Sequence, residues 1–168
     1  MDELEAEEST EEIIVNTMPD ARTGSSSDTT SEIKLDRALA CLLLRTTLGL
    51  NLALHGITRI FIGGVTQFVN TTLTQFQNTP LPAWQVRAFA TVLPYAELFL
   101  GVLLFVGLWT RWGLSAGALL MMALVFGTAL RSEWNILFLQ MFYSFLYFAL
   151  LMCRQYDSFS VDGLLRKG

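Results

Sequence analysis

The sequence has few residues that could bind a metal ion: one histidine and two cysteines among 168 residues. A structural zinc site needs four Cys or His ligands, and di-iron sites need several carboxylates and histidines. Cys41 and Cys153 are far apart in the chain and form no Cys-x-x-Cys motif. We therefore interpret both as free packing cysteines, and we expect the chain to build no metal site or other cofactor of its own.

Charged residues are scarce in four long apolar stretches, and 52% of the whole chain is hydrophobic. About 20 mostly apolar residues are enough to cross a bilayer as a helix. The stretches are Ala38–Phe61, Ala88–Trp109, Leu114–Leu130 and Asn135–Cys153. The sequence therefore predicts an all-α integral membrane protein, a four-helix bundle in the lipid bilayer.

Apolar residues are sparse in the N-terminal segment, residues 1–33, which holds ten of the fifteen acidic residues and a single basic one, Arg22. Such a segment buries too little apolar surface to offset the entropy lost on ordering. We expect residues 1–33 to be a disordered acidic tail and residues 34–168 to form the transmembrane domain. The acidic start also argues against a signal peptide. We expect no nucleic-acid partner.

The basic residues near the predicted span ends indicate the orientation. Six flank the side that holds both termini, and three flank the other side. The six are Lys34, Arg37, Arg111, Arg154, Arg166 and Lys167, and the three are Arg59, Arg87 and Arg131. The excess of positive charge predicts cytoplasmic termini, in what we expect to be a bacterial plasma membrane.

Between the first two spans lies a segment whose apolar residues recur at helical spacing. They are Val65, Phe68, Val69, Leu73 and Phe76, with Thr, Gln and Asn between them. This pattern predicts a short amphipathic helix at the membrane surface, which could cover one end of the bundle.

Glu97 is the most informative residue, because it lies near the middle of an apolar span. Ionisable groups at that depth are costly and mark a partner or a functional site. Counting about 1.5 Å per residue puts Asn51, Glu97 and Gln140 at one level. Arg45, His55 and Arg59 share a stripe of the first span with two glycines. These six residues are our candidate buried polar cluster or ligand site, and we assign no catalytic residue.

Two interpretations of Glu97 remain open from the sequence. It could be structural, either paired with Arg45 or satisfying a turn loosened by Pro94. It could instead bind a ligand or exchange a proton. For His55 there are three: a hydrogen bond to a carbonyl oxygen, a contact with a quinone, or a metal centre, which a single histidine disfavours.

Three motifs resemble the DoxX/DoxD-like membrane proteins. They are Leu44–Gly49 with His55–Phe61, Pro94–Gly101 with Gly107–Arg111, and the closing stretch Ser158–Gly163. The resemblance spans roughly Leu35 to Gly163. It implies a connection with quinone-linked oxidation, and therefore a bound quinone as the expected cofactor and redox or other membrane subunits as partners.

We carry three function hypotheses forward from the sequence. The first is a membrane subunit of a quinone-dependent oxidoreductase system, with an intramembrane pocket for a quinone or small substrate. The second is a non-catalytic accessory subunit of a larger membrane complex, docking through Gly113 and Gly117 and the acidic tail. The third is a small carrier, which the lack of an inverted repeat disfavours. Each is compatible with a homo-oligomer.

Overall fold

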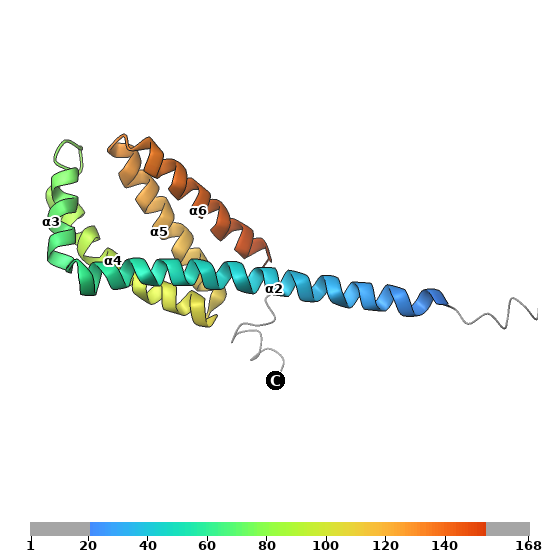
Figure 1. The fold of residues 1–168 in the computed structure, drawn as a ribbon. Helices are drawn as coiled ribbons and strands as arrows, with labels where there is room; N and C mark the ends of the chain where they lie inside the picture. Colours follow the sequence, from blue (N-terminus) through green and yellow to red (C-terminus); the bar gives the residue numbers. More distant parts are fainter. Residues whose placement is uncertain (1–20, 154–168) are drawn as a thin grey trace, which may run out of the picture. The chain divides into compact units, whose positions relative to one another are not determined.

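The computed structural model describes residues 21–153, which consist of helices joined by short turns (Figure 1). The helices in chain order are α2 (Ala21–Ile57), the π-helix η1 (Thr58–Ile62), α3 (Val65–Gln75), α4 (Ala83–Val106), α5 (Thr110–Leu130) and α6 (Trp134–Cys153). No strand occurs in this part of the chain. The all-α prediction is confirmed.

Four of these helices are long and apolar enough to cross a membrane. The spans are Ser31–Ile62, Ala83–Val106, Thr110–Leu130 and Trp134–Cys153. Each contains one of the four stretches predicted from the sequence, apart from a few residues at the ends. The protein is therefore an integral membrane protein, and the side chains exposed on these helices are mostly large and apolar, as a lipid environment requires.

The first helix begins earlier than the sequence predicts. We assigned residues 21–33 to a disordered tail, but they form the first turns of α2. Once a helix is nucleated, each further residue adds a hydrogen bond at little cost, so a span can extend into polar sequence. Residues 1–20, the rest of the predicted tail, lie outside the described residues. The chain divides into two units between Asp36 and Arg37, and the bundle belongs to the second.

Glycines allow α2 and α4 to approach backbone to backbone. A Cβ added at Gly101 would lie 2.3 Å from the backbone nitrogen of Ala53, and one added at Gly49 would lie 2.6 Å from that of Phe105. At Gly56 the same Cβ would meet Leu98 and the Pro94 carbonyl oxygen. Small residues at helix crossings in membranes gain van der Waals contact from this close approach. The contacts fix the register of α2 against α4.

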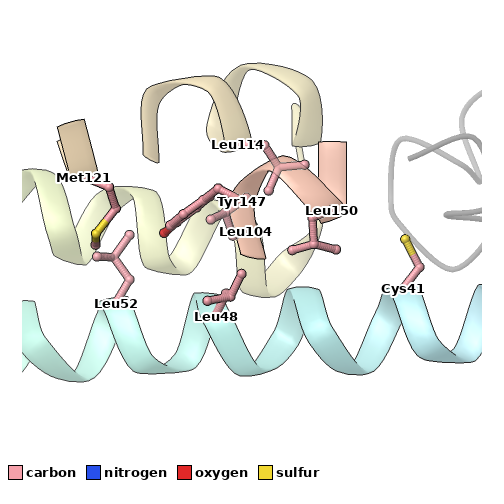
Figure 2. Packing of buried hydrophobic residues seen from close by; sticks show 8 residues of the cluster. All are labelled: Cys41, Leu48, Leu52, Leu104, Leu114, Met121, Tyr147 and Leu150. Carbon is pink, nitrogen blue, oxygen red and sulfur yellow. The ribbon is translucent and has the colours of Figure 1, made fainter. Parts of the chain in front are cut away.

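The core of the bundle is apolar and draws on four helices (Figure 2). Leu48 and Leu52 come from α2, Leu104 from α4, Leu114 and Met121 from α5, and Tyr147 and Leu150 from α6. A Cβ at Gly117 would lie 2.5 Å from the Tyr147 ring, and one at Gly113 would lie 3.1 Å from Leu104. The small-residue pattern of α5 therefore serves packing inside the bundle, not docking from outside.

The two cysteines lie at the same end of the bundle, as their positions in the spans predict. The Cys41 thiol donates a hydrogen bond to the Cys153 carbonyl oxygen at 3.4 Å. The two cysteines form no disulfide with each other; Cys41 is buried and Cys153 is exposed. Cys41 packs with the core leucines at this end, which agrees with its interpretation as a packing residue.

Candidate functional site

Glu97 forms a buried ion pair, but its partner is Arg59. The Arg59 NH1 group donates a hydrogen bond to Glu97 Oε1. The Glu97 side chain is 3% exposed and that of Arg59 is 26% exposed, so only the arginine reaches the surroundings of the pair. A buried carboxylate is costly unless it is paired in this way. Arg59 therefore supplies the positive charge that Glu97 needs at this depth.

Arg59 belongs to the π-helix η1, which ends the first span. Its backbone hydrogen bonds join residues five apart, in place of four apart in an α-helix. The Gly63 N–H donates to the Thr58 carbonyl oxygen at 2.8 Å, a hydrogen bond that spans five residues. Single π-turns inside helices occur frequently at functional sites. The guanidinium also lies over the Phe68 ring of α3, with its central carbon 4.5 Å from the ring centroid. Arg59 thus contacts both α4 and α3.

Two buried acceptor oxygens at the site have no hydrogen-bond partner among the described residues. They are Glu97 Oε2 and Gln140 Oε1. An unsatisfied buried polar atom costs about 1–3 kcal/mol, and such atoms are rare in folded proteins. These acceptors come from α4 and α6, and of the two residues only Gln140 lines the cavity described next.

A cavity of about 360 Å³ lies between α3 and the helices α4, α5 and α6; we call it the α3 cavity. Its polar lining comes from η1, α3, α4, α5, α6 and the turn after α5. Its apolar lining consists of four phenylalanines together with aliphatic residues, mainly from α4, α5 and α6. The lining includes Arg59, Phe68, Thr72, Gln75, Phe76, Gln85, Phe89, Phe126, Thr128, Arg131 and Gln140. The predicted amphipathic helix is confirmed as α3, and it forms one wall of this cavity.

The charged residues of the cavity lining are both arginines. Arg131, just after α5, lies over the Phe76 ring at 5.5 Å from its centroid, as Arg59 lies over Phe68. Neither Glu97 nor Glu133 is part of the lining. The cavity therefore combines apolar, partly aromatic walls with guanidinium and amide donors, which suits an apolar molecule carrying oxygen acceptors.

The predicted pairing of Glu97 with Arg45 is wrong. The Arg45 side chain instead lies beside Gly107, at the C-terminal end of α4. A Cβ added at Gly107 would lie 1.5 Å from Arg45 NH1. Arg45 on α2 and Arg59 on η1 are fourteen residues apart in one continuous span, or about 21 Å. Because α2 and α4 are locked in register by their glycines, only Arg59 can reach Glu97. Glycine is required at position 107 for two reasons: a side chain would clash with the Arg45 guanidinium, and the backbone φ is 78°, which glycine adopts without strain.

His55 does not face the bundle interior, contrary to the predicted stripe. Its side chain is exposed, and its Nδ1 donates a hydrogen bond to the Asn51 carbonyl oxygen at 2.8 Å. The buried residues of α2 occupy an arc that ends at Leu48, and His55 falls about 20° beyond it on an ideal helix. Of the three interpretations of His55, the carbonyl hydrogen bond is the one observed. Asn51 is half-buried and is not part of the α3 cavity.

The structure brings together Arg59, Glu97 and Gln140 from the predicted cluster, and it adds residues that the sequence did not single out. These are Arg131 and the α3 phenylalanines Phe68 and Phe76. Their signal in the sequence was weak but present. The two phenylalanines lie on the apolar face of an amphipathic helix, and Arg131 ends a span. Within residues 21–153, no group of three His, Cys, Asp or Glu residues could hold a metal ion.

A family model described as methylamine utilisation protein MauE matches residues 37–136. The match covers more than half of the chain. The protein belongs to the MauE family. The matched range contains Arg59, Glu97 and Arg131 and ends at the third residue of α6, before Gln140.

The family assignment confirms the coarser part of the sequence prediction, that the chain is a member of a membrane-protein family. Its relation to the DoxX/DoxD-like proteins stays a prediction, since the matching model is that of MauE. Comparisons with curated proteins and with solved structures returned no match.

Proposed function

We propose that this protein is a membrane subunit of a quinone-linked oxidoreductase system and that the α3 cavity binds the quinone head group. The observation that carries the proposal is the composition of the cavity: apolar walls that include four phenylalanines, with Arg59, Arg131 and Gln140 as hydrogen-bond donors. A quinone ring is apolar on both faces and carries carbonyl oxygens that accept hydrogen bonds. The family name, which refers to methylamine utilisation, supports a place in an oxidative system.

The size of the cavity is compatible with this ligand. Pockets for small molecules range from about 300 to 1,000 Å³, with apolar walls and a few polar groups that fix orientation. The α3 cavity, at about 360 Å³, is at the lower end of this range. It can enclose a single ring system, while an isoprenoid chain would extend between the helices into lipid.

Arg59 and Gln140 have separate roles in this proposal. Arg59 lines the cavity and is held from behind by Glu97, so one N–H group is committed to the ion pair while the others remain for a ligand oxygen. The Gln140 amide can donate to a quinone carbonyl, and its unpartnered oxygen can accept from a quinol hydroxyl. Glu97 does not line the cavity and acts as a positioning residue.

The chain's own residues bind and orient the ligand and exclude water from it. Bound quinone would supply the two-electron chemistry, and the electrons would come from a partner subunit or a substrate, because quinones and metals carry redox steps that ordinary side chains do not. The proposed partners are therefore redox subunits in the same membrane.

The proposal is tested by substituting Gln140. Purified Gln140→Leu protein should lose most of its affinity for decylubiquinone, measured by calorimetry in detergent micelles, by about tenfold for a lost hydrogen bond to an oriented ligand. Gln77→Leu is the matched control, since Gln77 is exposed and outside the cavity lining. Extracting the wild-type protein and identifying its lipophilic molecules gives an independent measurement.

Equal quinone affinity in wild type and Gln140→Leu would contradict the proposal. An extract without quinone, together with a stoichiometric protein partner, would favour the accessory-subunit hypothesis instead. That hypothesis has lost one of its predicted docking surfaces, because Gly113 and Gly117 are covered by Leu104 and Tyr147 within the bundle.

A further inference from the structure

The α3 cavity has an unbalanced charge. Among residues 21–153, its lining contains two guanidinium groups, those of Arg59 and Arg131, and no carboxylate. In a site surrounded by apolar helices, an uncompensated charge acts over a longer distance than in water, because the effective dielectric constant is lower. The sign of this charge therefore limits which ligands can enter.

The two arginines do not contribute equally to the imbalance. Arg59 is neutralised at close range by Glu97, whose side chain is 3% exposed. Arg131 has Glu133 at a longer N–O distance of 3.7 Å, and the Glu133 side chain is 49% exposed. Exposed ion pairs are weak because water and salt screen them. Arg131 is therefore the main source of net positive charge at the cavity.

The position of Arg131 is fixed by aromatic packing. Its guanidinium lies over Phe76, and Phe76 in turn packs against Gly127, where an added Cβ would be 3.2 Å from the ring. The N–H donors of a guanidinium lie at the edge of its plane, so they stay available when its central carbon lies over an aromatic ring. These donors can meet an oxygen atom of a ligand in the cavity.

We propose that Arg131 determines ligand selectivity: the α3 cavity accepts amphiphiles with an oxygen-acceptor head group of zero or negative charge and rejects the same chain with an ammonium head. The inference rests on the proposed function in that it concerns the same cavity. Two sources share the accepted chemistry, quinones and carboxylate lipids. A cation would be placed beside Arg131, whose only ion-pair partner among the described residues is the half-exposed Glu133 outside the lining.

The test compares three probes with equal chains, decylubiquinone, decanoate and decylammonium, binding to the purified full-length protein in uncharged detergent. Wild type should bind decanoate at least about tenfold more tightly than decylammonium, the expected effect of one partly screened charge. Arg131→Glu should reverse that order, and Arg131→Gln should abolish the difference. Circular dichroism checks that each variant is folded.

Arg87→Glu is the matched control. Arg87 lies on α4 beside the lining residue Val86, but it is exposed and outside the cavity. It carries the same charge change, so it reports any general electrostatic effect on probe partitioning. The decanoate preference should persist in this variant. An equal shift in Arg87→Glu and Arg131→Glu, or a wild type without preference, would overturn the inference.

The quinone probe separates the two proposals and the two ligand sources. Tight decylubiquinone binding without discrimination between decanoate and decylammonium would reject the role of Arg131 and leave the proposed function intact. Discrimination between the charged probes without decylubiquinone binding would support the role of Arg131 and reject the proposed function. It would identify a carboxylate lipid as the ligand.

Discussion

Replacing Glu97 by glutamine tests the buried ion pair directly. The substitution keeps the size of the side chain but removes its charge, so Arg59 is left without a counter-ion. Breaking one side of a fully buried pair costs about 3–5 kcal/mol. Because the Arg59 side chain is 26% exposed, it can recover part of its solvation, and we expect a loss of about 2 kcal/mol.

A double-mutant cycle identifies the partner. Combining Glu97→Gln with Arg59→Met removes both charges, so the double mutant should be more stable than the sum of the single effects predicts, by about 1–2 kcal/mol. The matched cycle uses Arg45→Met, since Arg45 is buried on the same helix but lies beside Gly107. There the effects should add to within about 0.5 kcal/mol.

The assay is the free energy of unfolding of the purified protein in mixed detergent micelles, followed by circular dichroism. Additive effects in the Arg59 cycle, or a larger coupling in the Arg45 cycle, would refute the register of α2 against α4 described above. A Glu97→Gln protein as stable as wild type would show that the ion pair contributes no net stability.

Two further outcomes follow from packing and charge. Gly101→Ala should destabilise the bundle by about 1–3 kcal/mol, because the added Cβ would meet the backbone of Ala53. Gly63→Ala should be nearly neutral, because the heavy atom nearest to its added Cβ is 3.7 Å away. Thermal unfolding of both variants measures the difference, and equal effects would contradict the prediction. A reporter fused after Gly168 should lie in the cytoplasm, and a reporter inserted at residues 77–80 should lie on the other side of the membrane. The reverse result would reject the orientation inferred from the basic residues.

The sequence alone was enough to predict the class of fold and the position of most elements. Long apolar runs have few structural alternatives, because a backbone in lipid must satisfy its hydrogen bonds internally. The amphipathic pattern from Val65 to Phe76 was equally informative, since one apolar face implies a surface to lie on. The sequence also identified Glu97 and Gln140, because polar residues inside a span are rare enough to stand out.

Only the tertiary structure decided which of these residues meet. Depth along a helix can be counted from the sequence, but the pairing of Glu97 with Arg59 depends on the register that Gly49, Gly56 and Gly101 set between two backbones. A displacement of one turn, about 5.4 Å, would change the partner. The cavity itself involves residues from α3, α4, α5 and α6, and Arg131 becomes part of it through a contact with Phe76, fifty-five residues away in the chain. Helix periodicity specifies the face on which a residue lies, whereas the neighbour opposite that face is set by packing between helices.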